Sequence, residues 1–393
     1  MVAVTLVVWP WAASPFSGSK WLLTGVAAAC SVLFLPRDRQ GAGAVALAAL
    51  ANLAACALSL ALSEGPRPWW TLAGPVLIAS FSLSRVPLPW RAVTWAGGLA
   101  AGVVLLQALG LDPLRAFAPD VEGARLARYG TLGNPDFVAS VLGVTAPLTL
   151  VAALHPWKPL TAGSAGVQLL GLALLRSFAT VLCLGAALLV VVVAGPRGSD
   201  RRRLALALGA GLLVSAVPLA GRSATAALAG RWYLVATAAR HVREASWLGH
   251  GPGAVALHWP AWEVERWRDR CGADAACVAA HPESRFAGVQ EHLHDDWLER
   301  VLEGGLLGLL ALMALFATAF VAAVRSGTLE GAGVGAGLAA LAVRATVDFP
   351  LARPADLVFL AVLCGAAARL ERADSVDGVG ALPPDSAPEG GVP

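Results

Sequence analysis

Side chains that can move protons and bind phosphate are concentrated in one region of the chain. Six of the seven histidines lie between His241 and His294, and histidine is the usual general base near neutral pH. Arginine, which binds phosphate oxygens bidentately, is abundant in the same region. These arginines are Arg231, Arg240, Arg243, Arg266, Arg268, Arg270 and Arg285. A long polar insert in an apolar protein is where chemistry is expected, and the alternative is a solvated loop with no special role.

The composition of the whole chain indicates a membrane protein. Of the 393 residues, 57% are hydrophobic and 14% charged, and the mean hydropathy is +0.67. Soluble domains carry about 25% charged residues, so this charge supply cannot build a water-soluble surface. The net charge of +3 is small and the basic residues are scattered, which argues against nucleic acid as a partner.

Apolar runs predict an all-α, polytopic integral membrane protein with about eleven or twelve transmembrane helices. A helix needs about 20 apolar residues to cross the hydrocarbon core. Residues 1–13 are apolar but short, and they lack the basic start and cleavage site of a signal peptide, so we expect a partial first helix there. The other spans are expected at residues 21–35, 41–63, 70–84, 92–111, 137–154, 165–175, 178–194, 204–219, 302–324, 332–343 and 355–368.

The charge of the connecting loops orients these helices. Lys and Arg favour short cytoplasmic loops, and alternate loops are basic, most clearly at residues 201–203. The other loops, including the long polar one, should face the periplasm or the cell exterior. We therefore expect N-terminal transmembrane helices in residues 1–220, a periplasmic loop region with the candidate active-site residues in 221–299, C-terminal transmembrane helices in 300–370, and a disordered cytoplasmic tail in 371–393.

Two cysteines, Cys271 and Cys277, fall in the predicted outer loop. On the oxidising side of a membrane a disulfide between them is expected. The competing interpretation is a metal site formed with His281, although the spacing matches no zinc signature. The other four cysteines lie in apolar runs, where they behave as small hydrophobic residues.

Three motifs, in order, resemble the O-antigen ligase family of bacterial membrane glycosyltransferases, which includes related polysaccharide polymerases. The resemblance covers roughly residues 130–368. The first motif is GTLGNPDF at 130–137, the second is GRW at 230–232 with WLGHGPG at 247–253, and the third is HLHDDWLE at 292–299 with EGGLLG at 303–308.

This resemblance implies a reaction and a location. The family moves a glycan from an undecaprenyl-pyrophosphate carrier to a hydroxyl of an acceptor sugar. The acceptor is lipid A-core for a ligase and another glycan for a polymerase. We expect a multi-pass protein of the bacterial inner membrane that works on its periplasmic face, without a metal or other cofactor.

Three side chains are expected to be catalytic. His294 matches the family's histidine and would take the proton of the acceptor hydroxyl, with Asp295 or Asp296 orienting its ring. Arg231 and Arg176 would stabilise charge on the leaving pyrophosphate. The alternatives are a histidine that solvates a helix start, a solvated loop arginine, and, for Arg176, an arginine that snorkels at a helix end.

Substrate-binding roles are expected for four more side chains. Arg222 is the substitute for the pyrophosphate arginines and His292 the substitute base. Asn134 either lines the substrate pocket or starts a helix, and Asp295 stands where the family commonly has Asn. Residues 251–253 (GPG) predict a turn, whose backbone N–H groups either approach phosphate or only reverse the chain.

Two other functional classes compete with glycan transfer. A transporter or flippase places ionisable side chains inside its spans, near the midplane. The predicted spans are almost free of such residues, with Arg344 at one end as the nearest case. The third interpretation is a membrane scaffold without activity, against which the His, Arg and Trp content of the outer loop argues weakly.

Overall fold

A computed structural model describes residues 1–8, 16–35, 42–63, 69–117, 127–154, 158–220 and 224–379. Within those ranges every regular element is a helix and none is a strand. The α-helices are α1 (Val2–Leu6), α2 (Gly18–Phe34), α3 (Ala44–Leu62), α4 (Ala73–Ser84), α5 (Trp90–Ala108), α6 (Pro135–Leu154), α7 (Pro159–Leu175), α8 (Phe178–Ala194), α9 (Ser199–Ala216), α10 (Ala224–Ala238), α11 (Ala254–Cys271), α12 (Ala275–Ala280), α13 (Asp296–Arg325), α14 (Leu329–Ala345) and α15 (Pro354–Val379). The 3-10 helices are η1 (Trp69–Leu72), η2 (Arg115–Phe117), η3 (Gly130–Leu132), η4 (Val217–Leu219), η5 (Ala239–Arg243), η6 (Pro282–Phe286) and η7 (Pro350–Ala352).

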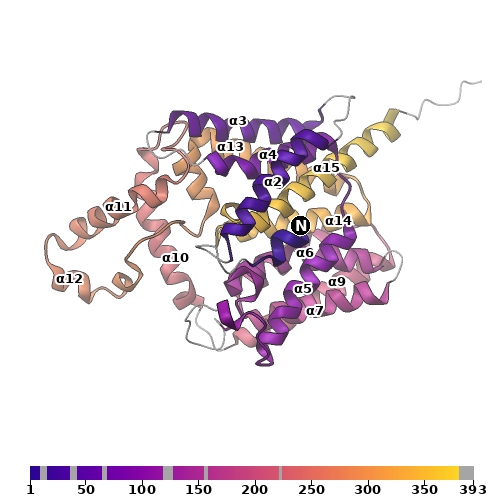
Figure 1. Cartoon of the computed structure of the whole chain (residues 1–393), viewed down its shortest axis with the longest axis horizontal. Coiled ribbons are helices and arrows are strands. Elements are labelled where there is room, and N and C mark those ends of the chain that lie inside the picture. The colour runs from indigo at the N-terminus through magenta and orange to yellow at the C-terminus, as the bar shows by residue number, and fades with distance from the viewer. Residues whose placement is uncertain are drawn as a thin grey trace, which may run out of the picture.

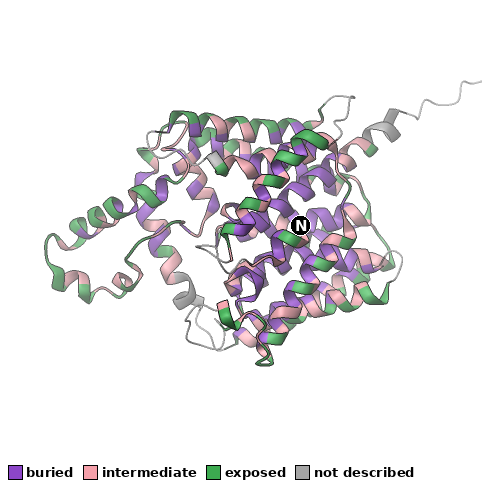
Figure 2. Cartoon of the chain, in the orientation of Figure 1, coloured by how far each residue is buried: buried purple, intermediate pink, exposed green. Residues whose placement is uncertain are grey.

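Five of the described helices are long and apolar enough to cross a membrane. They are α3, α5, α6, the continuous stretch Ser199–Leu219 and α13, and four shorter apolar helices accompany them at Gly18–Phe34, Trp70–Ser84, Pro159–Leu175 and Phe178–Ala194. A helix satisfies its own backbone hydrogen bonds, as a lipid-facing segment must. The outward faces of these helices are exposed while the bundle interior is buried (Figure 2). By length and composition the chain is therefore an all-α, multi-pass membrane protein.

The small residues of α14 let it pack at the centre of the bundle, against α6, α8, α13 and α15. A Cβ atom on Gly333 would lie 3.0 Å from Val151 of α6, and one on Gly337 would lie 3.2 Å from Leu363 of α15. Small residues are what allow helices to approach closely in a membrane, where no hydrophobic effect drives them together.

The polar insert forms a helical lobe of α10, α11 and α12 that projects from one side of the bundle (Figure 1). The lobe has its own small core, in which Tyr233, Trp259, Trp262 and Trp267 are buried around Leu293. A separate core allows this segment to hold its shape outside the apolar bundle.

The observed helix bounds differ from the predicted spans mainly at polar ends. The helix predicted from residue 302 begins six residues earlier, because the Asp295 side chain accepts hydrogen bonds from the backbone N–H groups of Trp297 and Leu298. The last helix continues to Val379, into the segment expected to be a tail. Within the predicted first helix, Val2–Leu6 is helical, and residues 9–15 lie outside the described residues.

Candidate functional site

His294 is held in place by the residues on either side of it. Leu293 is fully buried, and its N–H donates to Glu299 Oε2 at 3.0 Å. Asp295 caps α13. His294 itself has φ 55°, a left-handed conformation that is uncommon outside glycine and that clusters at functional sites. Its side chain remains 34% exposed, so the ring is fixed by its backbone and yet reachable from outside.

A buried carboxylate holds one ring nitrogen of His294. Nδ1 lies 3.2 Å from Asp348 Oδ1, and the Asp348 side chain is 1% exposed. The other oxygen of Asp348 accepts from Arg344 at 3.0 and 2.5 Å and from Arg353 at 3.1 Å. Burial opposes ionisation of Asp348, but Arg353 and Arg344 outweigh it and hold the pKa of Asp348 well below its usual range.

An ionised Asp348 is a hydrogen-bond acceptor only, so it favours the His294 tautomer that donates from Nδ1–H and leaves Nε2 as the nitrogen that can accept a proton. The two arginines already balance the carboxylate charge. The main effect of Asp348 is therefore to fix the orientation and tautomer of the His294 ring. It adds little net negative charge beside that ring.

The same network reaches the first sequence motif. Arg344 donates to the backbone oxygen of Asp136 at 2.7 Å, and the Asp136 carboxylate accepts from Ser177 Oγ at 2.7 Å. Asn134 Oδ1 accepts from the N–H of Asp136 at 2.8 Å, which makes it the cap of α6. Asn134 therefore starts a helix, as one of the two interpretations expected.

A second carboxylate extends the network into the bundle. Arg353 donates to Asp356 Oδ2 at 2.9 Å, and Ser140 of α6 donates to Asp356 Oδ1 at 2.7 Å. The Arg353 guanidinium also lies over the rings of Phe137 and Phe349, at 4.5 and 5.4 Å. Arg353 thus links side chains of α6, of α15 and of the segment around η7 to Asp348, which holds His294.

His292 has a different partner from His294. Its Nδ1 lies 2.8 Å from Glu299 Oε1, and its ring stacks on Phe349 at 4.6 Å. Burial lowers the pKa of His292, but the hydrogen bond and charge of Glu299 outweigh burial, so its pKa is raised above the usual value. A histidine that holds its proton in this way is poorly suited to serve as the base.

The two aspartates expected to orient His294 accept hydrogen bonds from backbone N–H groups instead. Asp295 caps α13 through its side chain, and Asp296 Oδ2 accepts from the N–H of Leu351 at 2.8 Å. Asp348, 54 residues beyond His294, occupies the orienting position. Sequence reasoning missed it, although four charged residues, Arg344, Asp348, Arg353 and Asp356, interrupt an apolar C-terminal region.

The candidate pyrophosphate arginines come from other helices than Arg344 and Arg353. Arg176 ends α7 with φ 52°, and its guanidinium donates to the carbonyl of Pro218 at 2.9 and 3.1 Å, although the adjacent Ser177 reaches Asp136. Arg231 is on α10, and its Nε is buried without a hydrogen-bond partner in the described part of the chain. Arg222 lies outside the described residues.

The glycine-rich turn joins the lobe to a break in α13. Gly305 has φ 65°, and the carbonyls freed by this break accept from the N–H groups of His250 (Leu302 O, 2.8 Å) and Gly251 (Glu303 O, 3.0 Å). In return, the N–H of Leu307 donates to Trp247 O at 3.2 Å. The N–H groups of His250 and Gly251 thus bind protein carbonyls and are not available for phosphate.

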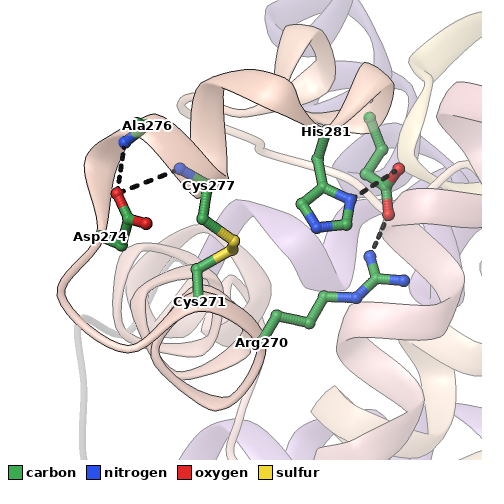
Figure 3. Close-up of a disulfide and its surroundings, with 7 residues drawn as sticks. Arg270, Cys271, Asp274, Ala276, Cys277 and His281 are labelled. Atoms are coloured by element: carbon green, nitrogen blue, oxygen red, sulfur yellow. Dashed lines mark hydrogen bonds and ion pairs between the residues drawn. A yellow bond between two sulfur atoms is a disulfide. The ribbon is translucent and has the colours of Figure 1, made fainter.

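Cys271 and Cys277 form a disulfide at the end of α11 (Figure 3). Asp274 closes the loop between them by accepting from the N–H groups of Ala276 and Cys277 at 2.9 and 3.2 Å. A sulfur or ring nitrogen of each cysteine and of His281 lies within 4.8 Å of the others. The disulfide uses both thiols, so of these three residues His281 is the one left as a ligand in this form of the protein.

No protein-family model matches the chain, and no curated protein matches it. The function must therefore be argued from the geometry of the site and from the motifs themselves.

Proposed function

We propose that this protein is a metal-independent membrane glycosyltransferase of the O-antigen ligase type. It would transfer a glycan from an undecaprenyl-pyrophosphate carrier to a hydroxyl of lipid A-core or of another glycan. In this proposal the chain crosses a bacterial inner membrane eleven or twelve times, with the lobe and His294 on the periplasmic side.

The observation that best supports this proposal is the His294–Asp348 pair. A neutral imidazole whose Nδ1 is bound to a buried carboxylate presents Nε2 as a general base. The pair stands at the start of an apolar helix, where a lipid-linked substrate would meet a soluble hydroxyl group. Parts of the three motifs contact one another here: residues 130–137 are bonded to Arg344, and residues 247–253 are bonded to residues 302–307 at the far end of the third motif.

The proposed reaction is a displacement at the anomeric carbon. His294 Nε2 takes the proton of the acceptor hydroxyl while its oxygen forms a bond to that carbon. The bond from the carbon to the carrier phosphate breaks, and undecaprenyl pyrophosphate leaves with the electron pair. The growing phosphate charge needs a cation. Arg344 and Arg353 already bind Asp348, so Arg231 and Arg176 are the proposed partners of the pyrophosphate.

Transfer of glycan from a purified lipid-linked donor, in liposomes that contain EDTA, tests the proposal. We expect activity to persist in EDTA, and His294→Ala to lower the rate about 10² to 10⁴-fold. His281→Ala, a change at a lobe histidine outside the Asp348 network, is the matched control and should keep the rate. Activity that EDTA abolishes and Mg²⁺ restores would refute the metal-free mechanism.

A flippase or transporter remains the second candidate, because the described helices bury more charge than their sequence suggested. Arg344 and Asp356 are each 1% exposed within α14 and α15, whereas only Arg344 was expected near a span. Reconstituted liposomes distinguish the two functions. A transferase forms a new glycosidic bond, whereas a flippase moves the intact donor across the bilayer with no product.

A further inference from the structure

A cavity of about 410 Å³ lies between α2, α3, α4, α11, α13 and α15, next to the candidate site. Its lining changes in character along α13. Near the start of that helix it is polar, and it then becomes apolar at Leu312, with Ile78, Leu357 and Leu360 on the facing helices. Leu312 follows Glu303 by nine residues, roughly 13 Å along a helix axis. The cavity thus has the two-part lining that suits an amphiphile.

The polar part of the cavity is richer in acceptors than in donors. Its carboxylates are Glu291, Asp296, Glu299 and Glu303. The cationic side chains there are His292, which binds Glu299, and Arg300, which donates to Cys56 Sγ at 3.2 Å. A pyrophosphate is itself a hydrogen-bond acceptor, so this acceptor-rich end suits a head group that donates hydrogen bonds better than it suits the lipid-linked donor.

One buried amide in the cavity wall has an oxygen that is unpaired within the described part of the chain. Asn52 lies in the middle of the apolar helix α3, and it is 2% exposed. Its Oδ1 has no hydrogen-bond partner among the described residues. A buried acceptor left unpaired is costly, and a polar side chain inside a membrane helix usually marks a binding site. Cys56, one turn farther along α3, lines the same cavity.

We propose that this cavity binds an amphiphile whose head group donates N–H or O–H hydrogen bonds to Asn52 and to Glu303. The hydrocarbon chain lies on the apolar wall around Leu312. Two kinds of head group supply this donor chemistry, a primary ammonium and a sugar. The proposal goes beyond the transfer reaction and does not depend on it, because binding is measured without a glycan donor.

Cys56 gives a direct measurement of occupancy. The protein, with Cys30, Cys183 and Cys364 replaced by Ser or Ala and its disulfide kept, is placed in nanodiscs of phosphatidylcholine. That head group has no N–H or O–H donor. Alkylation of Cys56 by N-ethylmaleimide is then followed by mass spectrometry, with and without added phosphatidylethanolamine or dodecyl maltoside.

We expect one of these amphiphiles to slow Cys56 alkylation roughly tenfold at ten times its Kd, because only the empty cavity reacts. Protection by phosphatidylethanolamine identifies an ammonium head, and protection by the maltoside identifies a sugar head. If neither compound slows the reaction below its rate in phosphatidylcholine alone, the proposal is overturned.

A variant at Asn52 tests the hydrogen bond itself. Asn52→Leu should raise the concentration for half-protection roughly tenfold, and its thermal midpoint should stay equal or rise because an unpaired buried amide is removed. Asn52→Ala provides a second variant if leucine does not fit. Ser59→Ala is the matched control: Ser59 lies on α3 and bonds the Glu303 carbonyl, but does not line the cavity. Equal loss of protection in this control would also overturn the proposal.

Discussion

Replacing Asp348 by Asn removes a charge while keeping the shape of the side chain. Arg344 and Arg353 both bind the carboxylate, and their side chains are 1% and 8% exposed. Breaking such a buried pair costs about 3–5 kcal/mol, so we expect a clear fall in the thermal midpoint. By analogy with a serine protease triad, loss of the orienting carboxylate should also lower the transfer rate about 10⁴-fold, because the wrong tautomer of the histidine is favoured.

His294→Ala is the informative comparison for Asp348→Asn. It leaves Asp348 with both of its arginines, so stability should change by less than about 1 kcal/mol. The transfer rate should still fall about 10² to 10⁴-fold. The two variants are thus expected to share a loss of activity and to differ in stability. Transfer from a purified lipid-linked donor and thermal unfolding of the same detergent samples measure both quantities.

The pH dependence sharpens this comparison. The lowered pKa of Asp348 contributes stability that is present above its unfolded value, about 3.9, and is lost as the pH falls through the lower folded value. The stability penalty of Asp348→Asn should therefore be complete at neutral pH and disappear in strong acid.

Two results would refute this reasoning. If His294→Ala keeps the full transfer rate, His294 is not the base. If His294→Ala is as unstable as Asp348→Asn, the pair is structural. Arg231→Ala provides a further comparison, because it should slow transfer by removing a proposed partner of the pyrophosphate.

Three further predictions test the framework of the site. Gly249→Ala should lower the thermal midpoint far more than Gly272→Ala. Both glycines have positive φ, but of the two only a Cβ at residue 249 would meet backbone, 2.3 Å from the carbonyl carbon of residue 303. Equal losses in the two variants would contradict this prediction. The raised pKa of His292 contributes stability that is complete below about pH 6.5 and is lost as the pH rises through its folded value. The thermal midpoints of wild type and His292→Gln should therefore converge in base. A difference between them that grows with pH would have the opposite sign and would contradict this prediction. A cysteine placed at Val289, which is 86% exposed on the lobe, should react with an impermeant thiol reagent on spheroplasts and one at Arg202 should not; the reverse pattern would invert the topology.

The helices could be predicted from sequence because each depends on local composition. Residues 178–194 were predicted as a span and form α8 with the same bounds, since apolar runs and their polar ends are visible in one dimension. Asn134 followed by Pro135 likewise indicated the start of α6, where the asparagine side chain and the fixed φ of proline both favour a helix start.

The partners of the site residues could not be predicted in this way. His294 and Asp348 are separated by α13 and α14, so their contact depends on how those helices pack. Asp295, adjacent in sequence, was the natural expectation, but its side chain caps α13. Arg344 and Asp348, four residues apart, offered a usable signal: charges at this spacing in an apolar region are retained when they are paired.

The break in α13 connects the lobe to His294. An unbroken helix would use the carbonyls of Leu302 and Glu303 internally, and the N–H groups of His250 and Gly251 would then lose these acceptors. The glycine at 305 frees those carbonyls, and the lobe is fixed to the helix whose first turn holds His294. Changes at Gly305 should consequently disturb His294 and the α10 helix that carries Arg231 together, whereas changes at Asp348 act on His294 and on the arginines Arg344 and Arg353. The second and third motifs are thus coupled by backbone contacts, while the base itself is set by the separate network around Asp348.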